Sequence, residues 1–181
     1  SISLEFAVIE RVGVDFPPGI LGAGTQSIDW IELGSGSTIA EIDEIGMEVE
    51  VLDEVFPATP IVIGRVRGGE PGPTVVLNGH LDTVPIPHAP PRLEGDLIYG
   101  RGTADMKGAL ACAAEAARAV MSLDSFPGEL VVLATGLHES PGGRGEDLAW
   151  LLSEHGFEAD SVIVCELGSD RFIAAHTGCA T

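Results

Sequence analysis

The sequence predicts an α/β fold, in which a mixed, largely parallel sheet carries helices on both faces. Between residues 47 and 78, three strand-like runs follow one another with short connections, which indicates that the sheet is mixed. From residue 108 onward, helix-like and strand-like segments alternate. This alternation is typical of strands joined by helices that cover the sheet.

Each element follows from the spacing of its apolar residues. Near the N-terminus, Ser27 could cap a short helix that the Gly-Ser run 34–37 interrupts before a second one begins. From Met47, apolar residues alternate with acidic ones, which predicts a strand. The Ala-rich segment 108–121 predicts a helix. The expected helices are thus 28–33, 38–45, 108–121 and 145–154, and the expected strands are 47–52, 61–66, 74–78, 129–135 and 161–165.

Composition narrows the class of protein. The chain has 181 residues, 45% of them hydrophobic, which is enough for one substantial core. Its net charge is −19 and Lys107 is its one lysine, so we expect no nucleic-acid partner. No apolar stretch approaches the roughly 20 residues of a membrane span, and the first residues lack the features of a signal peptide. We therefore expect no membrane contact and a cytoplasmic location.

The cysteines do not suggest a disulfide or a zinc site with CxxC spacing. Cys112, Cys165 and Cys179 are odd in number and lack CxxC spacing. We predict that all three are small buried thiols.

A His-x-Asp pair, His80 and Asp82, follows the strand expected at 74–78. In such a pair a ring nitrogen can bind a divalent cation while the carboxylate holds the other N–H and fixes the tautomer. Asp105 lies between small residues further along and could bridge a second ion. Alternatively, Asp105 could cap the helix that begins near Gly108.

Polar residues also follow the next two strands. Glu166 ends the apolar run VIVC, where burial of an unpaired carboxylate is costly without a cation or a hydrogen-bond cluster. His138 and Glu139 follow LVVLAT and precede a glycine-rich loop through which backbone could approach a ligand. Alternatively, this segment is an ordinary strand-to-helix turn with Glu139 solvated. Residues after strand ends are expected to share one edge of the sheet.

The motifs GHLDTVP (79–85), GRGTADMKG (100–108), a Glu followed by a glycine-rich loop, and VIVCE (162–166) together resemble the co-catalytic zinc metallopeptidases. That family includes acetylornithine deacetylase, succinyl-diaminopimelate desuccinylase, aminoacylase and carboxypeptidase G. The resemblance implies two zinc ions, replaceable by cobalt or manganese, and hydrolysis of an N-acyl amino acid or small peptide by a metal-activated water. It also implies that His80 and Glu166 bind one zinc, that Asp82 supports His80, and that Asp105 bridges both ions and precedes a cis peptide bond to Met106.

The chain departs from the family within the predicted site, and its N-terminus is also unlike the uninterrupted helix with which the family opens. Where members have two consecutive glutamates, a base and then a metal ligand, this sequence has His138-Glu139-Ser140. An ungapped match makes Glu139 the base, whereas one inserted residue makes Glu139 the ligand. We favour Glu139 as the base, with His138 at the second metal site, because imidazole binds zinc better than a hydroxyl does.

The resemblance also predicts what the chain represents. We expect residues 1–181 to be the N-terminal portion of a metallohydrolase catalytic domain, without the lid or dimerisation domain and the C-terminal part of the catalytic domain. Such a fragment would have an incomplete site, and the full-length protein is expected to be a homodimer. The alternative is a catalytically inactive relative that binds a small ligand through its metal.

Overall fold

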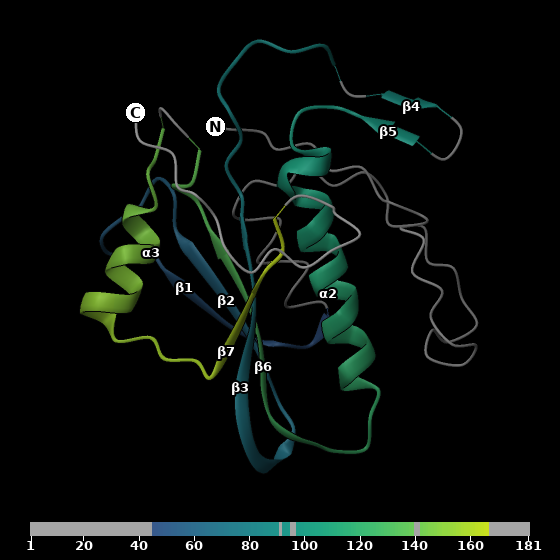
Figure 1. The fold of residues 1–181 in the computed structure, drawn as a ribbon, viewed down its shortest axis with the longest axis vertical. Helices are drawn as coiled ribbons and strands as arrows, with labels where there is room; N and C mark the ends of the chain where they lie inside the picture. Colours follow the sequence, from purple (N-terminus) through teal and green to yellow (C-terminus); the bar gives the residue numbers. More distant parts are fainter. Residues whose placement is uncertain (1–44, 91, 95–96, 140–141, 167–181) are drawn as a thin grey trace.

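The centre of the protein is a five-stranded sheet in the order β1-β2-β6-β3-β7 (Figure 1). The computed structural model describes residues 45–166 except 91, 95–96 and 140–141. The strands are β1 (Glu48–Leu52), β2 (Ile61–Arg67), β3 (Gly69–His80), β6 (Phe126–Thr135) and β7 (Ser161–Val164). The helices are α2 (Gly108–Met121) and α3 (Glu146–Trp150), with single π-helical turns at Thr103–Lys107 and Leu151–His155.

The strand directions make the sheet mixed. Strand β2 is antiparallel to both of its neighbours, β1 and β6, whereas β3 is parallel to β6 and to β7. Strands β1, β6, β3 and β7 therefore run the same way and β2 opposes them. The predicted mixed, largely parallel sheet is confirmed.

Alternating residues of the central strands bury opposite faces, as the pleat of a strand requires. One face packs against α2 and the other against the segment that contains α3, which Figure 1 shows on the two sides of the sheet. The first core comprises Met47, Val62, Val66, Leu81, Leu110, Ala113, Ala117, Val132 and Ala134. The second comprises Leu52, Ile61, Ile63, Val76, Val131, Leu133, Leu151 and Phe157. Helices on both faces are thus confirmed.

Two sequence predictions need correction. Cys112 is exposed rather than buried, because α2 packs against the sheet through positions 110, 113 and 117 and residue 112 falls outside that helical face. Cys165 is only half-buried, since β7 is an edge strand. The helices expected in the first 44 residues, and Cys179, lie outside the described residues.

One element was not predicted. A small hairpin of β4 (Arg92–Glu94) and β5 (Leu97–Tyr99) stands apart from the main sheet (Figure 1). Strands of three residues are too short for an apolar period to be recognised.

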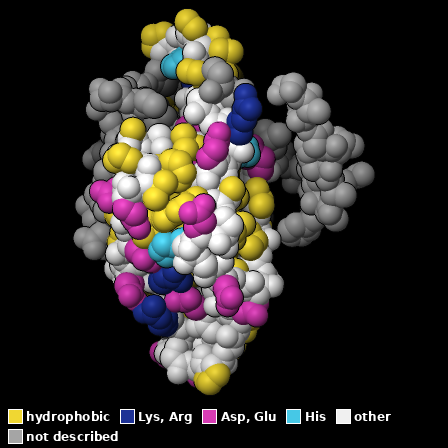
Figure 2. Space-filling view, turned by 90° about the vertical axis from the view of Figure 1, so that its left-hand side faces the viewer, with side chains coloured by type: hydrophobic (Ala, Val, Ile, Leu, Met, Phe, Trp, Pro, Cys, Tyr) yellow, Lys and Arg dark blue, Asp and Glu magenta, His cyan; other side chains and the backbone are white. Residues whose placement is uncertain are grey.

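The surface agrees with the acidic composition. Figure 2 shows acidic side chains spread over much of one face, where basic side chains are few. Within the described residues, no helix is long and apolar enough to cross a membrane.

Candidate metal centre

The predicted site residues converge because the parallel strands β3, β6 and β7 end at the same edge of the sheet. His80 is the last residue of β3 and is level with Thr135, the last residue of β6. His138 and Glu139 follow β6 directly, and Glu166 follows β7. Strand polarity therefore places residues from three distant parts of the sequence at one point.

His80 is oriented by Asp82. Its imidazole is buried, with Nδ1 at 2.9 Å from the Asp82 carbonyl oxygen and 3.3 Å from Asp82 Oδ1. Both partners are acceptors, so Nδ1 donates its proton to Asp82 and Nε2 faces the other side of the site. Nε2 lies 3.2 Å from Asp105 Oδ1 and 3.4 Å from Glu166 Oε2. Burial lowers the pKa of His80, but the hydrogen bonds to Asp82 and the nearby negative charges outweigh it and raise the pKa.

Asp82 also holds the segment that carries Glu139. Its Oδ2 accepts a hydrogen bond from the Glu139 backbone N–H at 2.6 Å. Burial raises the pKa of Asp82, but hydrogen bonds from His80 and from the amides of Glu139 and His138 outweigh it and lower the pKa. One carboxylate thus connects the end of β3 to the loop after β6.

Asp105 faces His80 and does not cap α2, whose N-terminus has no side-chain cap bond. The peptide bond from Asp105 to Met106 is cis, as the resemblance predicts. This turn sits tightly against the end of β3, because a Cβ on Gly79 would lie 2.6 Å from Met106 Cε. Glycine at position 79 therefore allows the turn to approach His80.

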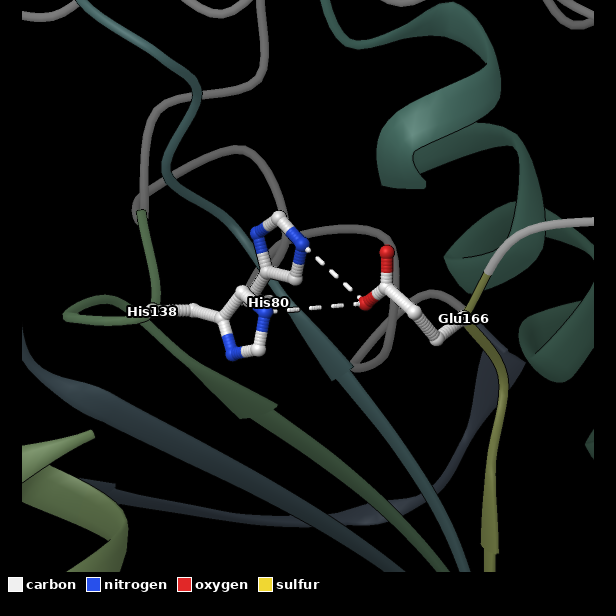
Figure 3. Close-up of side chains that lie close together, drawn as sticks. All are labelled: His80, His138 and Glu166. Carbon is white, nitrogen blue, oxygen red and sulfur yellow. Dashed lines mark ion pairs between the residues drawn. The ribbon is translucent and has the colours of Figure 1, made fainter. Parts of the chain in front are cut away.

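Glu166 points between the two imidazoles (Figure 3). Its Oε2 lies 3.4 Å from His80 Nε2 and 3.8 Å from His138 Nε2, and the rings stack with centroids 4.3 Å apart. This oxygen is buried and has no hydrogen-bond partner within the described part of the chain. Burial raises the pKa of Glu166. A carboxylate oxygen between two imidazole nitrogens is a donor set that suits zinc.

Two overlapping groups of donors could hold an ion. One comprises His80, His138 and Glu166, and the other His80, Asp105 and Glu139, with the donor atoms of each group within 4.8 Å of one another. His138 therefore lies in the group with His80 and Glu166, not at the second site where we predicted it, whereas Glu139 lies beside Asp105. Burial and the Asp105 carboxylate raise the pKa of Glu139.

Asp147 was missed by the sequence analysis. Its side chain is fully buried, and Oδ2 accepts hydrogen bonds from the backbone N–H groups of Gly136 and Leu137 at 2.7 and 3.2 Å. It thereby fixes the chain just before His138. In the sequence it resembles any acidic residue in the first turn of a helix, where the dipole favours one.

The glycine-rich loop approaches its own chain. Gly143 donates to the Glu139 carbonyl over 2.9 Å, and Gly145 donates to the Leu137 carbonyl over 2.6 Å. A Cβ on Gly143 would lie 2.2 Å from the Leu137 carbonyl oxygen. We predicted that backbone in this loop could approach a ligand; the close contacts that the structure shows are with the chain itself, and they hold the His138–Glu139 backbone.

Lys107, the one lysine of the chain, is also buried close to the site. Burial lowers its pKa to about 7, against the opposing effect of the Asp82 charge. The sequence analysis noted Lys107 only for its rarity.

The fold and this convergence of imidazoles and carboxylates define a protein of the metal-dependent hydrolase type. Residues 76–178 match the model of Peptidase family M20/M25/M40, so the chain belongs to this family. The resemblance drawn from the motifs is confirmed.

Similar curated proteins include two acyl-removing enzymes. The chain is 29% identical over 176 residues to N-formyl-4-amino-5-aminomethyl-2-methylpyrimidine deformylase of Bacillus subtilis, covering 91% of this chain and 38% of that protein. It is 33% identical over 153 residues to succinyl-diaminopimelate desuccinylase of Gluconobacter oxydans, covering 78% of this chain and 39% of that protein. The chain thus spans about two fifths of the length of these relatives.

Solved structures support the fold. The M20 family metallo-carboxypeptidase Sso-CP2 from Sulfolobus solfataricus is similar with a TM-score of 0.57 and 20% identity, over 72% of this chain and 32% of that one. Human carnosine dipeptidase 1 is similar with a TM-score of 0.52 and 19% identity, over 72% and 31%. At these identities the likeness concerns the fold of the catalytic domain.

Proposed function

We propose that this chain carries the metal-binding part of a hydrolase that cleaves the amide bond of an N-acyl amino acid or small peptide. The observation that carries the proposal is the convergence of His80, Glu139 and Glu166, from the ends of three strands, with Asp105 from the turn before α2. Two of the similar proteins are named for removing an acyl group, a formyl or a succinyl group. Amide hydrolysis that releases an amine is the reaction that the two have in common.

The residues fit zinc, and we propose two ions in the complete site. His80, His138 and Glu166 would hold one ion, and Asp105 would bridge to the second. The buried Glu166 oxygen without a hydrogen-bond partner among the described residues supports this assignment. Asp82 would hold the Nδ1 proton of His80, so that Nε2 could bind the ion.

Glu139 is the proposed proton carrier. Bound zinc would lower the pKa of a water molecule and polarise the amide carbonyl. The Glu139 carboxylate takes the proton of the attacking water and passes it to the leaving nitrogen. A raised pKa suits a group that must both accept and return a proton, and the bond from its backbone to Asp82 fixes its position.

The test is metal content together with hydrolysis. Protein purified without chelator, with a His80→Ala variant beside it, is analysed by mass spectrometry for bound zinc. The full-length protein is then assayed with N-succinyl and N-formyl amines. Zinc that is lost in His80→Ala, with amide hydrolysis, supports the proposal. Zinc without turnover of any amide would favour a metal-dependent ligand-binding module, and no zinc in either sample would contradict both.

A further inference from the structure

A cavity of about 330 Å³ opens beside the candidate metal centre. Asp105 and Glu139 line it on the side of the metal centre. The remaining wall comes from residues 88–90, from Arg92 and Tyr99 of the β4–β5 hairpin, and from residues 100–104, the segment before Asp105. The volume suits a small organic molecule, so a substrate group next to the scissile bond would enter here.

Two arginines line this cavity, in a chain of net charge −19. Arg92 is already engaged, because its Nε donates to Glu94 Oε1 over 2.5 Å and its guanidinium lies 4.2 Å from the centroid of the Tyr99 ring. Arg92 therefore acts as part of the wall.

Arg101 differs from the other described arginines. Arg65, Arg67, Arg92 and Arg118 each form an ion pair with a carboxylate, and the charge of Arg144 acts on Glu146. No carboxylate within the described residues forms an ion pair with Arg101, although the chain carries 28 acidic residues. Arg101 is exposed and lines a ligand-sized cavity. A guanidinium offers a planar fork that matches a carboxylate.

We propose that Arg101 binds a carboxylate of the substrate in this cavity, and that it sets a preference for anionic substrates. This inference rests on the proposed function. The carboxylate could belong to the acyl group, as in a succinyl chain, or to the amine product, as in an amino acid. Either carboxylate would offer the same charged oxygens to Arg101. The two pairs of substrates in the test distinguish a carboxylate on the acyl group from one on the amine product.

The test compares Arg101→Gln with Arg118→Gln, an exposed arginine on α2 that does not line the cavity. The full-length protein is assayed with two pairs of substrates, and the members of a pair differ only in a carboxylate that is replaced by a carboxamide. The first pair is an N-succinyl amine and its N-succinamoyl counterpart, and the second is an N-acyl amino acid and its carboxamide. In the wild type, kcat/KM should favour the carboxylate member of at least one pair by about tenfold or more, as expected for a charged hydrogen bond. Arg101→Gln should remove that ratio, Arg101→Lys should keep part of it, and Arg118→Gln should leave it unchanged.

A binding measurement separates failure of this inference from failure of the proposed function. Calorimetry with succinate and with butyrate compares a dicarboxylate with a monocarboxylate of the same chain length. Tighter binding of succinate that is lost in Arg101→Gln supports the carboxylate site even if no amide is cleaved. Equal binding of succinate and butyrate by the wild type would overturn the inference, and so would a preference for succinate that survives in Arg101→Gln. Turnover without any preference for the carboxylate substrates would also overturn it.

Discussion

Asp147 should contribute more to stability than any exposed aspartate of the chain. The Asp147→Asn change keeps the shape of the side chain but replaces one carboxylate oxygen with an NH2 group. In the protein Oδ2 accepts from two backbone N–H groups, those of Gly136 and Leu137, and Oδ1 accepts from the Leu148 N–H at 2.8 Å. An amide cannot accept on both sides, so at least one buried donor loses its acceptor.

The magnitude follows from these contacts. A buried donor without an acceptor costs about 1–3 kcal/mol, and a neutral oxygen accepts more weakly than a carboxylate does. We expect the free energy of unfolding to fall by about 2–4 kcal/mol. With a urea m-value of about 2 kcal/mol/M, the midpoint of unfolding should shift by roughly 1–2 M.

The assay is urea unfolding followed by circular dichroism, with Asp160→Asn as the matched control. Asp160 Oδ2 also accepts a backbone N–H, that of Thr74 at 2.8 Å, but at the surface, where water can replace it. Its substitution should cost less than about 0.5 kcal/mol. Equal midpoint shifts for the two variants would refute the claim that burial of Asp147 organises the loop before His138.

Four further predictions concern the site. Glu139→Gln should lower amide hydrolysis by about 10²–10⁴-fold while zinc content stays unchanged, because it removes the proton acceptor and keeps the shape; loss of zinc instead would identify Glu139 as a ligand. His138→Ala should weaken zinc binding by roughly 10–100-fold or more, because loss of a residue that only supports a metal ligand already costs that much. Unchanged zinc affinity and stoichiometry would exclude His138 as a ligand. Zinc affinity, measured by titration, should fall about tenfold per pH unit below the pKa of His80, because a protonated imidazole cannot bind the ion. Since this pKa is raised above 6.5, the fall should begin above pH 6.5. An onset below pH 6.5 would contradict the bond to Asp82. Gly143→Ala should reduce hydrolysis far more than Gly142→Ala. The added Cβ would lie 2.2 Å from a backbone oxygen at position 143, but 3.3 Å from the nearest one at position 142. Equal activities of the two variants would show that the loop adjusts.

The sequence allowed the sheet and the convergence of the candidate donor residues to be predicted, because each depends on a local signal. Alternation of apolar residues identified the strand expected at 47–52, which the structure has as Glu48–Leu52, and the position of His80 after a strand placed it at the edge of the sheet. The role of Asp147 could not be predicted, because the backbone N–H groups that its carboxylate binds, those of Gly136 and Leu137, lie about ten residues earlier in a loop. Arg101 could not be distinguished either, because only the packing of the hairpin shows that it lines a cavity while other arginines pair with acids.

The geometry of the site gives Asp82 a wider role than support of a single ligand. Its backbone carbonyl and one side-chain oxygen lie beside the His80 ring, and its other oxygen accepts from the Glu139 backbone. The orientation of a proposed metal ligand and the position of the proposed base therefore depend on one carboxylate. Because both contacts are short and partly buried, a shift of Asp82 would move His80 and Glu139 together. This shared anchor explains how His80 and Glu139, which are far apart in the sequence, can keep a fixed separation. The proposed proton transfer would require such a fixed separation.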